Sequence, residues 1–308
     1  MKIEKKLFDT IYNYFPDANI DTNKWKDIFT SSSSNPSIFH LLNTVKYYVS
    51  YFSDNNSINL SMVLYNDKKA VGIMPLMVHK NLKKEWILSS NGVEIIEPIF
   101  KNTLTNKTRK KIEIKILDLI FDLSKQLKIN RCQFSNIDFF KLSKWYINLL
   151  DTAEETFASH HLLVDLSLSI EKIKSNFRKS FKPLINKGFR EWKIEVHEHV
   201  KKEQFENFRK LHKSVSGKST RPTESWNIQR DSVNSKESFV ITVSDKKNLL
   251  VGFGLFVYSK YSGSYAVGVY KRELFNKPLG HAVQMKAIEI FKNKGLKWYE
   301  IGNKHLSI

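Results

Sequence analysis

The chain has 308 residues, 41% of them hydrophobic, which is enough to build a sizeable core and excludes a wholly disordered protein. Fifty basic residues against 31 acidic ones give a formal net charge of +19, which attracts polyanions such as nucleic acid, nucleotide phosphates and anionic lipid. The single cysteine, Cys132, excludes an intrachain disulfide and a cysteine-rich zinc site.

The first residues do not have the pattern of a signal peptide. The segment MKIEKKLFDTIYNYF interrupts its apolar residues with charge and has no small-residue cleavage site. No run in the chain approaches 18 apolar residues, so we expect no transmembrane span. Together these observations predict a cytoplasmic protein.

Apolar spacing in the first half predicts alternating helices and strands. The expected elements are an amphipathic helical region over 1–30, a hairpin of strands 60–65 and 70–79 around the turn 66–68, a helix over 108–127 and a strand over 129–136.

The second half continues the alternation. After a strand at 162–168, one helix is expected over 169–190, capped by Ser169, kinked at Pro183 and ending at Lys187-Gly188. The remaining expected elements are strands 192–197, 238–244, 249–258, 263–270 and 296–302, and helices 202–214, 224–234 and 281–294.

The two halves end alike. Residues 95–136 and 264–303 share the order strand, basic loop, helix, lysine-containing turn, strand. This alternation predicts an α/β fold with a mixed sheet and parallel crossovers, and a duplicated domain is the economical explanation. We therefore expect two domains, 1–160 and 161–308.

The most informative stretch is the segment that leads into the last long helix. Lys277 and Gly280 precede and open this helix, followed by His281 and Ala282. Free main-chain amides at a helix N-terminus favour an anion, and a glycine there allows a phosphate to approach. An ordinary helix start is the alternative explanation.

This stretch resembles the phosphate loop of the GNAT acetyltransferase superfamily, Gln/Arg-x-x-Gly-x-Gly/Ala, with Lys277 standing where Gln or Arg is usual. The basic helix around 177–188, the loop at 216–226 and the ending 295–302 extend the resemblance to the FemAB-like branch. That branch carries two tandem GNAT-like domains and transfers acyl or aminoacyl groups to amines. Its relatives continue beyond the last strand, so further elements are expected after Ile308.

The resemblance implies a site in the second half, with some residues in more than one role. For the donor phosphate we expect Lys277, Gly280, His281 and Ala282. For an anionic acceptor we expect Arg178, Gly217, Lys218, Arg221 and Trp226. For proton transfer or oxyanion stabilisation we expect His212, His281, Tyr265 and Lys277. An alternative for the loop 216–226 is a polar connection with Trp226 in the core.

The resemblance also implies the substrates. The donor is expected to be acyl-CoA or aminoacyl-tRNA, and the acceptor a small molecule, a cell-wall precursor or an amino sugar of a surface polysaccharide. No metal is expected, because the histidine pairs 160–161 and 197/199 lack further ligands at suitable spacing. A transferase that uses aminoacyl-tRNA would have tRNA as a partner. The alternatives are a catalytically idle GNAT-like scaffold and a basic nucleic-acid-binding module. The oligomeric state is left open.

Overall fold

A computed structural model describes residues 2–32 and 35–304, and the chain divides into two compact units, Met1–Phe157 and Ala158–Ile308. The elements expected after Ile308 lie outside the described residues. Among the described residues, no helix has the length and apolar character needed to cross a bilayer.

The first unit packs helices around small sheets. Its helices are α1 (Lys2–Tyr14), α2 (Thr22–Ser31), α3 (Leu42–Tyr51), α4 (Asn106–Leu127) and α5 (Lys144–Leu150), with 3₁₀ turns η1 (Ile38–His40) and η2 (Ser53–Asn55). Its strands are β1 (Ile58–Asn59), β2 (Met62–Asn66), β3 (Lys69–Met74), β4 (Met77–Lys80), β5 (Trp86–Ser89), β6 (Ile95–Ile96), β7 (Ile99–Phe100) and β8 (Phe134–Ser135). The sheet orders are β2-β3-β7, β1-β4-β5 and β6-β8.

Alternating side chains of the β2-β3-β7 sheet fill two separate cores. Met62 and Leu64 belong to the core that α1 and α4 share, whereas Val63 between them belongs to the core formed with α2 and α3. Successive strand residues point to opposite faces, so this sheet lies between two helical layers. The antiparallel pairing of β2 with β3 confirms the predicted hairpin, but its second strand, predicted over 70–79, ends at Met74, and residues 77–80 form β4 of another sheet.

The second unit is built on one larger sheet. Its strands are β9 (His160–Asp165), β10 (Lys193–His197), β11 (Ser238–Ser244), β12 (Leu250–Tyr258), β13 (Ser262–Tyr270) and β14 (Trp298–Lys304), in the spatial order β10-β11-β12-β13-β14-β9. Its helices are α6 (Ile170–Asn176), α7 (Phe181–Glu191), α8 (Lys202–Ser216), α9 (Thr223–Asn234) and α10 (Leu279–Asn293), with the 3₁₀ turn η3 (Arg272–Leu274). Neighbouring strands are antiparallel, except that β13 and β14 run parallel.

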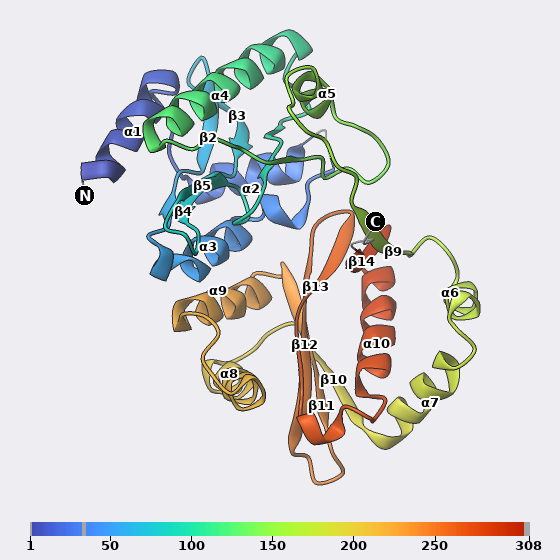
Figure 1. The fold of residues 1–308 in the computed structure, drawn as a ribbon. Helices are drawn as coiled ribbons and strands as arrows, with labels where there is room; N and C mark the ends of the chain where they lie inside the picture. Colours follow the sequence, from blue (N-terminus) through green and yellow to red (C-terminus); the bar gives the residue numbers. More distant parts are fainter. Residues whose placement is uncertain (1, 33–34, 305–308) are drawn as a thin grey trace. The chain divides into compact units, whose positions relative to one another are not determined.

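Helices cover both faces of this sheet (Figure 1). On one face, α10 and α7 pack on Phe239, Ile241 and Val243 of β11. On the other face, α8 and α9 pack on Val240 of the same strand and on Phe253 of β12. The mixed α/β fold predicted from the sequence is therefore confirmed. The predicted helices 108–127, 202–214, 224–234 and 281–294 are also confirmed, with ends shifted by a few residues.

The single helix predicted over 169–190 is wrong, because the chain forms α6 and α7 with a break between them. Phe177 has extended backbone, with φ −72° and ψ 151°, and ends α6. Pro183 causes no kink, since it stands in the first turn of α7, where a missing amide hydrogen costs nothing.

Gly188 does not end the helix either, since α7 continues to Glu191. A Cβ at Gly188 would lie 2.7 Å from the carbonyl oxygen of Pro278 and 2.8 Å from the Cβ of Ala282. This glycine is therefore a packing residue, and its missing side chain lets α7 approach the first turn of α10.

The helical region predicted over 1–30 is confirmed as two helices with a break between them. Pro16 disfavours helical backbone at the residue before it, and α1 ends at Tyr14. The next helix begins after Asp21, whose carboxylate accepts hydrogen bonds from the amides of Asn23 and Lys24. The strand predicted over 129–136 is reduced to β8, because only two of its residues pair with β6.

Candidate functional site

The parallel strands β13 and β14 separate part-way along their length. Their pairing is confined to Ser262, Gly263 and Ser264 of β13, opposite Trp298–Glu300 of β14. Beyond this point β13 still pairs with β12 as far as Tyr270, whereas β14 pairs only with β9. The outer edge of β13 from Tyr265 onward therefore has no strand partner among the described residues.

This free part of β13 is open to solvent. Ala266 and Gly268 are both exposed, whereas Gly263, in the paired part of the strand, is buried. Main-chain amides and carbonyls along a free strand edge can bind an extended ligand as an added strand. The edge therefore offers a track for the extended part of a substrate.

Two tyrosines belong to this part of β13. The ring of Tyr265 lies over Gly268, where a Cβ would collide with the tyrosine hydroxyl, so only glycine permits this placement. The hydroxyl of Tyr270 is buried close to the side chain of Tyr265, but the two do not meet with full hydrogen-bond geometry. Burial raises the pKa of Tyr265 and raises that of Tyr270 well above its usual value. Both hydroxyls therefore remain protonated at neutral pH and can donate hydrogen bonds.

The start of α10 is the next feature along the chain. No side chain caps this helix, and the structure records no main-chain acceptor, among the described residues, for the amides of Gly280 and His281. A Cβ at Gly280 would make only ordinary van der Waals contact, with the ring and hydroxyl of Tyr270 at 3.9 Å, so no atom crowds this residue. Ala282 is buried, and its amide is 3.4 Å from the carbonyl oxygen of Pro278. Lys277 is exposed just before the helix.

The other side of the α10 start is covered by α7. The ring of Phe181 meets the imidazole of His281 edge-on, with ring centroids 4.9 Å apart. Burial lowers the pKa of His281, so its imidazole is neutral near pH 7. Arg178 is exposed in the turn between α6 and α7. The exposed basic residues of this turn, of α7's first turn and of the loop before α10 are Arg178, Lys179, Lys182, Arg272 and Lys277.

The structure brings three of the predicted site residues together on the opposite face of the sheet. The guanidinium carbon of Arg221 lies 3.8 Å from the ring centroid of Trp226, and its Nη2 donates a hydrogen bond to Gln229 at 2.6 Å. The imidazole of His212 meets the same indole edge-on at 5.1 Å. Burial and the neighbouring charge of Arg221 lower the pKa of His212. Trp226 is only 4% exposed and belongs to the core beneath α8 and α9.

The loop that follows α8 lies near the end of β13. Gly217 ends α8 with φ +76°, a left-handed backbone that favours glycine, and Lys218 after it is exposed. Arg272, which follows β13, donates from Nε to the carbonyl oxygen of Val215 in the last turn of α8, at 2.8 Å. This bond holds the loop beside the end of β13 that leads into α10.

Sequence reasoning missed one hydrogen-bonded chain in this unit. The Nδ1 of His161 on β9 lies 2.7 Å from the Oε1 of Glu300 on β14, within hydrogen-bond distance. The Nε2 of the same imidazole lies 3.1 Å from the Oγ of Ser159. Glu300 is the last β14 residue paired with β13, so the pair stands where the two strands separate. The sequence shows each residue but not this contact, because 139 positions separate them.

The imidazole of His197, one of the histidine pair 197/199, contacts two polar side chains of the second unit. His197 lies 2.9 Å from the hydroxyl of Thr242 and 3.2 Å from the side-chain nitrogen of Gln204. Throughout the residues that the structure describes, no three His, Cys, Asp or Glu side chains gather as a metal site would require.

Comparison with known proteins identifies likeness in structure but not in sequence. No protein-family model matches the chain, and no curated protein matches it. FemX superposes with a TM-score of 0.65 over 94% of this chain and 90% of its own, at 12% identity. L-PGS from Bacillus licheniformis gives a TM-score of 0.58 over 93% of this chain and 77% of its own, at 12% identity.

A third similar structure is the C-terminal domain (DUF2156) of a protein described as a lysylphosphatidylglycerol synthetase from Agrobacterium fabrum. It has a TM-score of 0.55 over 92% of this chain and 78% of its own, at 11% identity. Identities this low show a common fold and no more. The chain therefore has the fold of FemX, of L-PGS and of this synthetase domain, as its resemblance to the FemAB-like branch predicts.

Proposed function

We propose that the chain is a transferase that moves an acyl or aminoacyl group from an anionic donor to an amine of a cell-envelope molecule. One observation carries the proposal: the uncapped start of α10, where no atom crowds Gly280 and the buried hydroxyl of Tyr270 stands beside it. The amides of a helix N-terminus favour a phosphate, and the basic residues around this one add to the attraction.

The donor is proposed to lie along the free edge of β13. Its phosphate accepts hydrogen bonds from the amides of Gly280 and His281, with Ala282 packed beneath them and Lys277 adding charge. The rest of the donor extends along the edge from Tyr270 toward Tyr265, where main-chain groups can hold its amide or ester groups. Such positioning supplies much of the rate enhancement in a group transfer between two bound substrates.

The carbonyl oxygen of the transferred group gains negative charge as the amine attacks. A tyrosine hydroxyl that is protonated and has no acceptor of its own can donate a hydrogen bond to this oxygen. Burial keeps Tyr270 protonated, and its hydroxyl makes no complete hydrogen bond to the neighbouring Tyr265, so it can turn toward this oxygen. The carbon–nitrogen bond forms as the bond from the carbonyl carbon to the donor's leaving atom breaks.

The attacking amine must lose a proton. We propose that His161 accepts this proton, because the carboxylate of Glu300 orients its imidazole, an arrangement common to histidine bases. The pair stands where β13 and β14 separate, next to the proposed path of the donor. His212 and His281, which the sequence suggests for this step, have no carboxylate partner among the described residues.

The acceptor class follows from the similar structures. One of them is named for the synthesis of lysylphosphatidylglycerol, and the FemAB-like resemblance implies amines of envelope precursors. The acceptor roles of Arg178, Gly217, Lys218, Arg221 and Trp226 stay predictions. The donor, acyl-CoA or aminoacyl-tRNA, and the involvement of surface polysaccharide stay predictions too.

Thermal unfolding in the presence of donors tests the proposal. Acetyl-CoA or charged tRNA should raise the Tm of the chain, since a ligand that binds only the folded state stabilises it. Gly280→Val should abolish the shift because its side chain fills the phosphate position, and Gly280→Ala should reduce it by a smaller amount. Gly280→Ala should fold, because a Cβ at Gly280 meets nothing closer than 3.9 Å, and circular dichroism checks the fold of Gly280→Val.

Two results would count against the transferase. A chain stabilised by neither donor would be an idle scaffold. A shift produced equally by uncharged tRNA and unrelated RNA, and unaffected by Gly280→Val, would indicate a nucleic-acid-binding module.

A further inference from the structure

The outer face of α4, in the first unit, presents large apolar side chains to solvent. Phe121 is 68% exposed and Ile114 is 50% exposed. They stand seven positions apart on one helix, so they lie on the same side, while Ile116, Leu119 and Leu123 on the opposite side fill the core. Exposed apolar residues grouped in this way mark a binding surface more often than scattered ones do.

Lysines surround these two residues. The exposed basic residues on the same side of α4 are Lys107, Lys110, Lys111, Lys115 and Lys125. Asp118 is the one exposed acidic side chain of the helix, and none of the five lysines forms an ion pair with another described residue. We call the five lysines, together with Ile114 and Phe121, the α4 face. Its net charge is positive, and its ammonium groups are available to an external anion.

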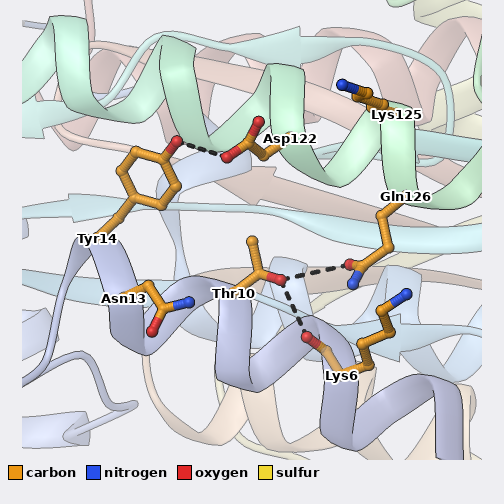
Figure 2. A pocket seen from close by; sticks show the side chains of 7 residues that line it. All are labelled: Lys6, Thr10, Asn13, Tyr14, Asp122, Lys125 and Gln126. Atoms are coloured by element: carbon orange, nitrogen blue, oxygen red, sulfur yellow. Dashed lines mark hydrogen bonds between the residues drawn. The ribbon is translucent and has the colours of Figure 1, made fainter.

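A polar groove continues the α4 face toward α1. The groove has a volume of about 500 Å³, and Lys6 and Lys125 contribute to its walls. Figure 2 shows Lys125 and Gln126 of α4 opposite Lys6 and Thr10 of α1. The acidic residue in the groove, Asp122, already accepts a hydrogen bond from Tyr14 at 2.6 Å. The groove therefore offers two ammonium groups to an anionic group of headgroup size.

We propose that the α4 face binds the surface of an anionic lipid bilayer, with α4 lying parallel to it. Phe121 and Ile114 enter the boundary between headgroups and acyl chains, while the lysines extend to the lipid phosphates. The two exposed apolar residues distinguish a bilayer from nucleic acid. A nucleic-acid backbone would engage the lysines but would leave the isoleucine at the centre of the face without an apolar partner.

This inference does not depend on the proposed transferase. The α4 face belongs to the first unit, and the donor site belongs to the second. Loss of lipid binding would leave the donor-induced rise in Tm intact, and loss of donor binding would leave lipid binding intact. If both proposals hold, the chain works where lipid-linked envelope molecules are found.

Co-sedimentation of the full chain with vesicles tests the inference. Binding is expected to vesicles of equal parts phosphatidylglycerol and phosphatidylcholine, and only weakly to phosphatidylcholine alone. Ile114→Ser with Phe121→Ser, and separately Lys110→Glu with Lys111→Glu, should each lower the partition coefficient by about tenfold or more. Circular dichroism should show an unchanged helix content, since all four residues are exposed.

The turn between β11 and β12 supplies matched controls. Lys246→Glu with Lys247→Glu makes the same charge change, and Leu249→Ser removes an apolar side chain that is 55% exposed. These variants should bind vesicles as the native chain does. The inference is overturned by equal loss in the controls, by no preference for anionic lipid, or by α4 variants that lose tRNA binding but keep vesicle binding.

Discussion

Two glycines in helices of the second unit, Gly188 and Gly280, differ in how closely other atoms approach them. A Cβ at Gly188 would meet the Pro278 carbonyl oxygen at 2.7 Å, whereas a Cβ at Gly280 would meet nothing closer than 3.9 Å. Gly188→Ala should therefore destabilise the chain by about 1–3 kcal/mol, because a main-chain carbonyl cannot move aside cheaply. Gly280→Ala should change the stability by less than about 1 kcal/mol.

Urea unfolding of both alanine variants measures this difference. Equal stability of Gly188→Ala and the native chain would show that α7 and α10 do not approach as closely as the structure indicates.

His40 makes the first unit sensitive to acid. Its side chain is fully buried, with Nε2 2.9 Å from the carbonyl oxygen of Glu97 and Nδ1 accepting from the amide of Ser37. Burial lowers the pKa of His40 to about 4. The unfolded state takes up a proton below about pH 6.5 while the folded state does not, so stability is lost as pH falls from there toward pH 4.

The free energy of unfolding falls by about 3 kcal/mol in full through this histidine as the pH is lowered. Urea unfolding of the native chain and of His40→Gln, compared at neutral and at mildly acidic pH, isolates it. The variant is less stable at neutral pH but should lose less on acidification. An identical pH dependence in the two proteins would exclude this role for His40.

At this scale the sequence predicts residue types better than residue contacts. Gly280 and His281 can be identified because they stand at a helix start, a local feature. The role of Gly188 and the pairing of His161 with Glu300 depend on segments that are distant in sequence, which no local pattern reports.

At the scale of elements, the separation of β13 from β14 creates the proposed site. His161 and Glu300 stand at this point of separation, beside the path proposed for the donor. His161→Gln should lower kcat for transfer by about 10²–10⁴-fold, because the attacking amine loses its proton acceptor. His160→Gln, a change to an exposed neighbour on the same strand, is the matched control.

Rates for these two variants with acetyl-CoA or charged tRNA as donor test the assignment. If His161→Gln changed KM alone, or if both variants behaved alike, His161 would not be the base.

Most elements of the second unit could be predicted, because buried strands and amphipathic helices carry strong periodicity. The break between α6 and α7 could not, since apolar residues keep helical spacing across it and only the extended backbone of Phe177 interrupts the helix. The point at which β13 and β14 stop pairing could not be predicted either. Pairing depends on both strands, and the sequence of one strand does not specify it.

At the scale of the whole molecule, the fold is recognised from structure at 12% identity, where no family model matches the sequence. The two units, Met1–Phe157 and Ala158–Ile308, each place a sheet between helical layers. Duplication of one ancestral domain and the expected domain limits of 1–160 and 161–308 stay predictions. Part of the excess positive charge lies on the α4 face and around the start of α10.

The central claim is that main-chain amides at the start of α10 hold the phosphate of the donor. The most direct test records the amide NMR signals of Gly280 and His281 while coenzyme A or charged tRNA is added to the full chain. We predict downfield shifts of both amide protons that saturate with the binding isotherm of one of these donors. Donor binding that leaves both signals in place would contradict the claim.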